Sequence, residues 1–327
     1  MASSNKIIFE CKNLSKHFTI GRGISFTLKK RGVIKAVDGI NLRLKEKEIL
    51  GIAGESGSGK STTAEMIVRL LEPSDGEIFI DGKKIDQLQK RDLKDFVSKV
   101  QMIFQDPFGT LNPRNSLYRT VEEPLIIQGV KDRKKRLEKV INTLELAELK
   151  PAEKYLNRLP FQLSGGESQR VAIARAMVLD PRLLIADEPV SMLDVSIRAG
   201  ILNLLKNLRD EAGISIIYIS HDLSTIRYLC DRIAIMYLGK IVEMGITKDV
   251  INHPKHPYTE LLVNSVPAIR SENKRQNENY GEIPDQIRPH TGCNFSPRCR
   301  KKMAKCESVE PEKKEIEKDR FVSCHLY

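Results

Sequence analysis

The chain has 327 residues, of which 40% are hydrophobic, so it can form one large domain with an appendage, or two domains. No apolar run approaches the roughly 18–20 residues that span a bilayer, and the N-terminus lacks a signal-peptide core, so we expect a soluble, cytoplasmic protein. The formal charge of +11 is spread over local runs and only 6% of the residues are aromatic, which argues against direct nucleic-acid binding.

The first predicted elements are short strands. Ile7–Cys11 and Asn41–Leu44 alternate between apolar and polar residues, and Glu48–Ala53 has the pattern of a buried strand that ends in a glycine-rich loop. Between the first two strands, residues 21–34 form a basic, glycine-containing insertion, which predicts a surface hairpin or loop.

A helical region follows these strands. Thr62–Leu71 predicts a helix and Gly76–Asp81 a strand that closes at a turn. From about residue 87 to 177 the pattern is helical, with an apolar stripe at i, i+3, i+4 and i+7 that begins at Leu137. This block predicts an inserted helical lobe.

Apolar strand runs return in the second half of the chain, at Leu183–Ala186, Ile214–Ile219 and Ile233–Tyr237. Strands that alternate with helices predict an α/β fold with a parallel sheet. Residues 271–279 are polar without an apolar anchor, which predicts a linker or an exposed loop.

A phosphate-binding loop lies between the predicted strand and helix. The residues Gly54, Glu55, Ser56, Gly57, Ser58, Gly59, Lys60 and Ser61 match the pattern G-x-x-x-x-G-K-[ST], and Thr62 completes the predicted nucleotide-binding set. The glycines let backbone N–H groups turn toward phosphate oxygens at the start of a helix. Lys60 is predicted to contact the β- and γ-phosphates, and the Ser61 hydroxyl to bind Mg²⁺.

Two adjacent carboxylates end the strand Leu183–Ala186. Neighbouring strand residues point in opposite directions, so Asp187 and Glu188 can take separate roles. Asp187 is predicted to hold Mg²⁺, directly or through water, and Glu188 to polarise the attacking water.

The motifs, taken in order, resemble the ATPase subunits of ABC transporters over residues 7 to 262. The matching residues are the loop Gly54–Ser61, Gln105 in Phe104–Pro107, the signature peptide Leu163–Arg170, Asp187–Pro189, Ser191–Asp194 and His221 with Asp222. The resemblance implies a P-loop ATPase core with an inserted helical lobe. It also implies that ATP binds between the P-loop of one subunit and the signature peptide of the other, in a head-to-tail dimer.

The signature peptide is the part that serves the neighbouring subunit. Ser164, Gly165 and Gly166 are expected to offer a hydroxyl and backbone N–H groups to the γ-phosphate across the interface. The next residue is Glu167, where the family usually has glutamine. Its carboxylate would repel a triphosphate unless it points away or pairs with a cation such as Arg170, and we expect activity to survive.

The resemblance also assigns further roles. His221 is expected to hydrogen-bond the γ-phosphate, and Gln105 to reach Mg²⁺ or the attacking water and to link the nucleotide to the helical lobe. Asp194 is expected at the dimer seam. Phe18 is the candidate to stack on adenine by its position, although its chemistry fits a core residue equally well.

Further sequence features narrow the resemblance to the oligopeptide/dipeptide/nickel importer ATPases, and within them to the F-type subunit. They are Phe104–Pro107 followed by Leu111–Arg114, the run Asp187–Ser191, and His253–Thr259 ahead of a cysteine-rich tail. The implied function is ATP-driven import of peptides, with nickel or a related solute as an alternative cargo.

The implied partners are an identical or paralogous ATPase subunit, two transmembrane permease subunits and, indirectly, an extracytoplasmic solute-binding protein. The implied location is the cytoplasmic face of the cell membrane. A soluble ABC ATPase that acts on nucleic acid or ribosomes is the alternative, since it would fit the basic charge.

Four cysteines, Cys293, Cys299, Cys306 and Cys324, lie in the last 35 residues. Structural zinc usually uses tight C-x₂₋₄-C pairs, so this looser spacing favours a [4Fe–4S] cluster over zinc, as the resemblance also implies. The absence of any metal and a redox sensor that gates the ATPase remain open alternatives. We thus predict an ATPase domain at residues 1–262, with its helical lobe at about 87–177, and a metal-cluster extension at 263–327.

Overall fold

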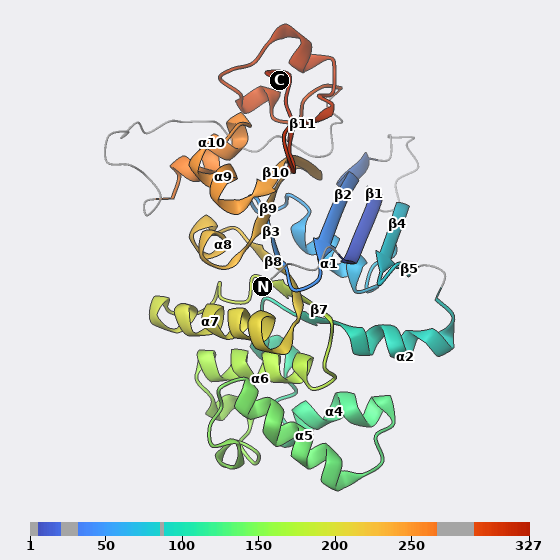
Figure 1. Cartoon of the computed structure of the whole chain (residues 1–327), viewed down its shortest axis with the longest axis vertical. Helices are drawn as coiled ribbons and strands as arrows, with labels where there is room; N and C mark the ends of the chain where they lie inside the picture. The colour runs from blue at the N-terminus through green and yellow to red at the C-terminus, as the bar shows by residue number, and fades with distance from the viewer. Residues whose placement is uncertain (1–5, 21–31, 86–87, 267–290) are drawn as a thin grey trace, which may run out of the picture. The chain divides into compact units, whose positions relative to one another are not determined.

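The computed structural model of the chain describes residues 6–20, 32–85, 88–266 and 291–327 (Figure 1). Its contacts divide it into two compact units. The first comprises the described parts of residues 1–9, 44–49 and 80–219, and the second those of residues 10–43, 50–79 and 220–327. The polar segment 271–279 lies outside the described residues, as does the predicted insertion at 21–34 except for its last three residues.

Three parallel strands form the sheet of the first unit. They follow the order β8-β7-β6 and are β6 (Val100–Ile103), β7 (Leu183–Asp187) and β8 (Ser215–Ser220). Val100 pairs with Leu183, and Leu183 with Ser215, so the strand ends are in register at one edge. Every residue of β7 and β8 is buried, as is typical of parallel strands covered on both faces.

Helices make up most of the rest of the first unit, together with the short strand β5 (Lys83–Lys84). They are α2 (Lys90–Lys99), α3 (Pro107–Thr110), α4 (Leu117–Gln128), α5 (Arg133–Leu146), α6 (Gly165–Met177) and α7 (Val195–Ala212), with 3₁₀ turns at Ala152–Lys154 and Pro160–Gln162. Helices α4, α5 and α6 pack on one another (Figure 1). In the predicted apolar stripe of α5, Val140 and Leu144 are buried but Leu137 is 39% exposed.

The second unit contains strands of two sheets. Side by side in the order β2-β1-β4 lie β2 (Gly32–Lys45), β1 (Ile7–Ile20) and β4 (Asp75–Ile80) (Figure 1). The other set follows the order β11-β12-β10-β9-β3 and consists of β3 (Ile49–Ala53), β9 (Arg232–Tyr237), β10 (Lys240–Ile246), β11 (Lys313–Glu317) and β12 (Arg320–Ser323). Of these neighbours, β3 and β9 run parallel, whereas the other pairs are antiparallel.

The helices of the second unit are short. They are α1 (Lys60–Ile67), α8 (Leu223–Leu229), α9 (Thr247–Asn252) and α10 (Pro257–Asn264), with 3₁₀ turns at Ser296–Arg298 and Ala304–Glu307. Among the described residues of the whole chain, no helix is both long enough and apolar enough to cross a membrane.

The predicted α/β class is confirmed, with three instructive differences at the level of elements. Helix α1 begins at Lys60, two residues before the prediction, because its first turn is part of the glycine loop. The predicted helical region is interrupted by strand β6. Strand β12 of the C-terminal extension joins β10, with Glu243 opposite Val322, so the extension continues a sheet of the second unit.

Candidate functional site

The loop Gly54–Ser61 joins β3 to α1 and requires glycine at two positions. A Cβ atom on Gly54 would lie 2.2 Å from the carbonyl oxygen of Met236. Gly59 has a φ of +104°, and a Cβ atom there would lie 2.2 Å from the carbonyl oxygen of Ala36. Only glycine fits both the left-handed conformation and this close backbone packing.

Lys60 is the first residue of α1, and it is only 5% exposed. Its Nζ donates hydrogen bonds of 2.9 Å to the carbonyl oxygens of both Gly54 and Glu55. Ser56, Gly57 and Ser61 are exposed, whereas Thr62 is half-buried. The loop therefore combines an ammonium group fixed by two hydrogen bonds with several exposed residues, which are features that a triphosphate-binding loop needs.

Two further predicted residues belong to the second unit. His221 directly follows β8 and is exposed, and the next residue, Asp222, caps α8 by accepting from the N–H of Ser224 at 2.8 Å. Phe18 lies on β1 with 40% of its surface exposed, and the Lys16 ammonium is 5.5 Å from its ring centroid. Phe18 is therefore not a core residue, and its stacking on adenine stays a prediction.

The first unit brings Gln105 and Glu188 together. Gln105 Nε2 donates to Glu188 Oε2 at 3.4 Å. Glu188 has a φ of +46°, and its backbone is held by an N–H bond of 2.9 Å to Ile219 and by the Ser191 hydroxyl, which donates to its carbonyl oxygen at 3.0 Å. A left-handed non-glycine residue fixed in this way is typical of functional sites. Asp187, at the end of β7, is 5% exposed.

The signature peptide forms the start of α6. The Ser164 hydroxyl oxygen accepts from the N–H of Glu167 at 3.3 Å, and the Glu167 carboxylate accepts from the N–H of Ser164 at 2.9 Å. This reciprocal pair is a capping box, which satisfies N–H groups that have no partner inside the helix. The pattern S-x-x-E at Ser164–Glu167 carries this signal in the sequence, and our sequence interpretation overlooked it.

The capping box also corrects the predicted partner of Glu167. Arg170 donates instead to the Ala147 carbonyl oxygen and to the Glu148 carboxylate. The cation near Glu167 is Arg158, at 3.7 Å. Hydrogen bonds from Ser164, above all from its backbone N–H, lower the pKa of Glu167. The negative charge of Glu167 is thus directed at the N-terminus of its own helix, α6.

Asp194 is exposed and stands at the N-cap position of α7, where its side chain makes no capping hydrogen bond. Its predicted place at a dimer seam is not tested within one chain. The predicted residues therefore fall into two sets. Gln105, Asp187, Glu188, Asp194 and the signature peptide belong to the first unit, and Phe18, the P-loop and His221 to the second.

The four cysteines of the extension are free thiols. Burial is the main cause of the raised pKa values of Cys293, which reaches about 11, and of Cys299 and Cys324, and repulsion among the thiolates adds to it. Backbone N–H groups of Phe295, Lys301 and Leu326 oppose the rise by donating to these sulfurs. The second residue after each of these three cysteines supplies the N–H group.

In the part of the chain that the structure describes, no group of three or more His, Cys, Asp or Glu side chains could hold a metal ion. The predicted iron–sulfur cluster and its zinc alternative are therefore not confirmed. The thiols lie close enough to affect one another electrostatically, but no three of them form a ligand set.

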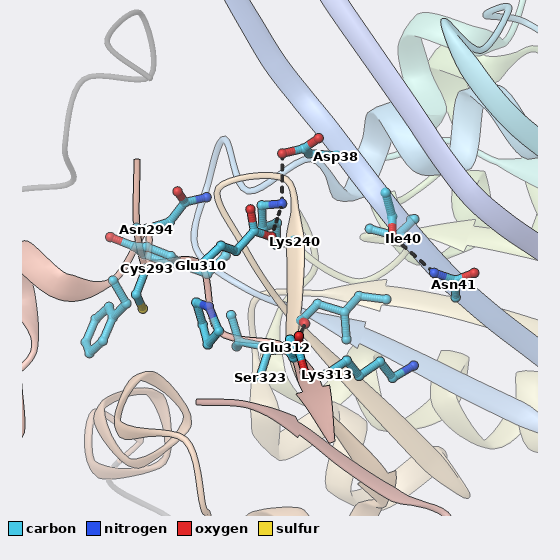
Figure 2. Close-up of a pocket in the computed structure, with 17 residues that line it drawn as sticks. Asp38, Ile40, Asn41, Lys240, Cys293, Asn294, Glu310, Glu312, Lys313 and Ser323 are labelled. Atoms are coloured by element: carbon cyan, nitrogen blue, oxygen red, sulfur yellow. Dashed lines mark hydrogen bonds and ion pairs between the residues drawn. The ribbon is translucent and has the colours of Figure 1, made fainter. Parts of the chain in front are cut away.

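A cavity of about 390 Å³ lies where the extension meets β2 and β10 (Figure 2). Lys240 bridges its two sides, because its ammonium lies 2.9 Å from Asp38 and 2.5 Å from Glu310. These contacts are part of what fastens the extension to the rest of the second unit. The Cys293 and Asn294 side chains stand at the same cavity (Figure 2).

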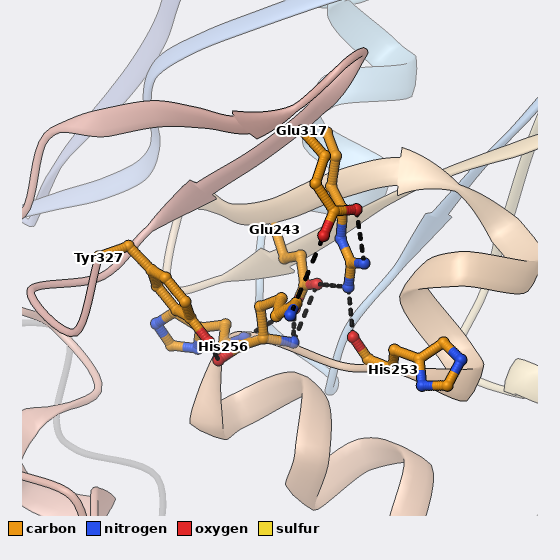
Figure 3. Close-up of polar contacts among 7 residues, drawn as sticks. Glu243, His253, His256, Glu317 and Tyr327 are labelled. Carbon is orange, nitrogen blue, oxygen red and sulfur yellow. Dashed lines mark hydrogen bonds and ion pairs between the residues drawn. The ribbon is translucent and has the colours of Figure 1, made fainter.

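A buried ion pair makes a second attachment (Figure 3). Arg320 of β12 donates to the Glu243 carboxylate at 3.0 Å and to the His253 carbonyl oxygen, and both charged side chains are at most 5% exposed. Glu243 also accepts from the N–H groups of Lys255, at 3.1 Å, and His256, at 2.8 Å. Our sequence interpretation missed this pair, although a glutamate in the apolar run Ile241–Met244 is a signal that a partner is needed.

Comparisons with known proteins agree with the motifs. A family model described as ABC transporter matches residues 37–191, and one described as the C-terminal region of oligopeptide/dipeptide transporters matches residues 242–306. Among solved structures, the ATP-binding cassette MJ0796, described as a dimer in a post-hydrolysis state bound to ADP and Pi, is 34% identical. It has a TM-score of 0.64 and covers 73% of this chain and 98% of its own.

Relatives match along almost the whole length. The oligopeptide transport ATP-binding protein AppF of Bacillus subtilis is 42% identical over 100% of this chain and 99% of its own. The dipeptide transport ATP-binding protein DppF of Escherichia coli is 36% identical over 96% of this chain and 93% of its own. The chain therefore belongs to the oligopeptide/dipeptide family of ABC transporter ATP-binding proteins.

Proposed function

We propose that this protein is the ATP-hydrolysing motor subunit of an importer for di- and oligopeptides. The observation that carries the proposal is the presence, on one chain, of an ATPase segment and of the C-terminal region that marks oligopeptide/dipeptide transporters. Full-length relatives named for oligopeptide and dipeptide transport support it.

The reaction is ATP + H₂O → ADP + phosphate. The water oxygen bonds to the γ-phosphorus while the bond from that phosphorus to the β,γ-bridging oxygen breaks. Glu188, with Gln105 beside it, is the group that accepts the proton of the attacking water. The Lys60 ammonium contacts the phosphates, and His221 the γ-phosphate.

Mg²⁺ is the metal that this reaction requires, and it neutralises charge on the phosphate oxygens. Ser61 is exposed at the start of α1, and Asp187 ends β7 as a nearly buried carboxylate. A hydroxyl, a carboxylate and the Gln105 amide oxygen are the oxygen ligands that Mg²⁺ prefers, so these three residues fit its chemistry.

The working form is proposed to be a dimer with an identical or paralogous ATPase subunit, bound to two permease subunits at the cytoplasmic face of the membrane. Ser164, Gly165 and Gly166 would act on the ATP of the partner, with Asp194 at the seam. The dimeric state named for the cassette MJ0796 supports this arrangement. The ATPase domain is proposed to end near residue 262, where the extension begins.

We also propose a metal cluster in the C-terminal extension. Its support is the spacing of Cys293, Cys299, Cys306 and Cys324 and the backbone N–H groups directed at three of the sulfurs. Iron, acid-labile sulfide and zinc should be measured in protein purified without oxygen. Equal iron and sulfide would support the cluster, zinc alone would contradict it, and the absence of all three would leave the extension without a metal.

A transport experiment tests the proposed function. In a strain that lacks this gene, plasmid-borne wild-type protein should restore uptake of a labelled dipeptide or oligopeptide. Glu188→Gln should not restore uptake and should lower the ATPase rate by about 10²-fold or more, since it removes the general base. Glu211→Gln is the matched control, because Glu211 is exposed on α7 and away from the motifs. Uptake that is the same with and without the protein would overturn the proposal.

A further inference from the structure

The C-terminal extension reaches the P-loop through Arg298. Arg298 donates from Nη1 to Glu55 Oε2 at 2.7 Å and from Nη2 to Glu55 Oε1 at 2.9 Å, so it binds both oxygens of the carboxylate. Its side chain is 7% exposed, against 26% for Glu55. Bidentate pairs of this kind fix the direction as well as the distance of the two groups, and they raise the pKa of Arg298.

An aromatic cluster holds the guanidinium in place. Arg298 lies 5.8 Å from the ring centroid of Tyr237 and 5.9 Å from that of Phe295. Those two rings are 5.3 Å apart, and Tyr258 packs on both, at 4.5 and 5.5 Å. Because the rings are buried, Arg298 has few other positions to adopt.

Glu55 is consequently fixed at three of its groups. Arg298 holds its carboxylate, and its backbone N–H donates to the Tyr258 hydroxyl at 2.9 Å. Its carbonyl oxygen accepts from Lys60 Nζ at 2.9 Å. Two of these three contacts come from residues far along the chain, so the shape of the P-loop at Glu55 depends on the elements that follow α9.

A second contact connects the residues just before Arg298 to the P-loop. The Asn294 side chain donates to the Leu238 carbonyl oxygen at 3.2 Å. The next residue, Gly239, donates its N–H to the Ser58 carbonyl oxygen at 2.9 Å. Arg298 therefore contacts the P-loop directly, whereas Asn294 is connected to it through Leu238 and Gly239, and each stands beside a cysteine, Cys293 or Cys299.

The charges of the Arg298–Glu55 pair affect nucleotide binding. A carboxylate in a phosphate-binding loop repels a triphosphate, and the guanidinium that pairs with it cancels this repulsion. The positive end of α1 and the Lys60 ammonium can then act on the phosphates without a competing negative charge.

We propose that Arg298 is a positioning residue for the nucleotide site, through which the segment 293–299 of the extension sets the ATP affinity of the P-loop. The inference rests on the proposed ATP binding of this chain. Coupling of this kind is reciprocal, so nucleotide also stabilises the segment 293–299.

The test is nucleotide binding by the full-length protein, with Mg²⁺ and a non-hydrolysable ATP analogue in a calorimeter. Arg298→Gln should raise the Kd about 5- to 20-fold, since it leaves the Glu55 carboxylate uncompensated. Adding Glu55→Gln to that variant should restore most of the lost affinity, because the repulsion is then removed. A purely structural role of Arg298 would give no such rescue.

Lys301→Gln is the matched control. Lys301 lies three residues further along the extension and pairs with Glu260, at 2.7 Å, away from the P-loop. Its Kd should stay within about twofold of the wild type. Circular dichroism of each variant would separate a local effect from a loss of folding.

Hydrogen exchange gives a readout independent of affinity. In the wild type, the nucleotide analogue should slow amide exchange in residues 293–299, and Arg298→Gln should abolish this protection. Unchanged affinity and unchanged protection in a folded Arg298→Gln variant would overturn the inference. Wild-type protein that binds no nucleotide would instead overturn the proposed function.

Discussion

Glu167 stands in the signature peptide where the family usually has glutamine, and its carboxylate is turned back onto the start of its own helix. The contacts with Ser164 explain why the acidic residue is accommodated, since either a carboxylate or an amide oxygen can accept from that N–H. The hydrogen bonds lower the pKa of Glu167, so their contribution to stability is present at neutral pH and is lost as the pH falls through the lowered value.

We therefore expect Glu167→Gln to keep the capping box and change ATPase turnover by less than about twofold, equivalent to roughly 0.5 kcal/mol. Glu167→Ala removes the acceptor and should lower the free energy of unfolding by about 1 kcal/mol. Steady-state ATPase assays and urea unfolding measure the two effects. A tenfold change in turnover for the glutamine variant would show, contrary to our expectation, that the charge acts on the partner's nucleotide.

At the scale of elements, β6 shows where sequence periodicity is insufficient. Its four residues follow α2 directly, so the helical pattern of the region continues into them. Pairing with β7, in which Val100 lies opposite Leu183 and Ile103 opposite Ala186, makes this run a strand. A partner far along the chain supplies that pairing, and no local pattern reports it.

Helix α10 carries a pH-dependent cap. His256 Nδ1 accepts from the N–H of Tyr258 at 3.0 Å, and burial of the ring lowers its pKa to about 3. A protonated imidazole has no acceptor, so the cap requires the neutral ring. Between the usual pKa of 6.5 and about 3, the unfolded chain binds a proton that the native chain does not.

Stability should accordingly fall as the pH decreases below 6.5, by up to about 1.4 kcal/mol per pH unit from this residue. His256→Asn keeps a capping acceptor and should remove that dependence. Urea unfolding at about pH 7.5 and about pH 5 compares the two proteins. If the free energy of unfolding fell by the same amount between these two pH values in wild type and variant, His256 would not be the source of the pH dependence.

At the scale of the whole molecule, ion pairs help to attach the C-terminal extension to the rest of the second unit, together with the pairing of β12 with β10 and the packing of Phe295 on Tyr237 and Tyr258. Lys240 joins Asp38 and Glu310 on one side, and Glu243 joins Arg320 on the other (Figures 2 and 3). The second pair is the buried one, so breaking it leaves a charge without compensation.

Arg320→Met should therefore lower the free energy of unfolding of the extension by about 3–5 kcal/mol, because it leaves the buried Glu243 carboxylate without its cation. Adding Glu243→Gln should recover much of this loss, since the amide is neutral and still accepts from Lys255 and His256. Denaturant titrations in which unfolding of the extension is detected by its proteolysis measure these changes in the free energy of unfolding. Lys318→Met, at an exposed position, should cost less than about 0.5 kcal/mol.

The sequence by itself determined the α/β class, the P-loop and the two adjacent carboxylates at the end of β7. These features are local: a glycine that must adopt a left-handed φ, or an apolar run that ends in two acids, is encoded within about ten residues. Family membership followed from the order of such motifs and was confirmed by the comparisons.

Only the tertiary structure decided which distant residues meet. Arg298 and Glu55 are 243 residues apart, and Arg320 and Glu243 are 77 apart, so neither pair leaves a periodic signal. A charged residue in an apolar run indicates that a partner of opposite charge is needed, but the fold of the intervening chain determines which residue becomes that partner. The sequence therefore specified the parts of the nucleotide site, and the three-dimensional packing attached the C-terminal extension to one of them.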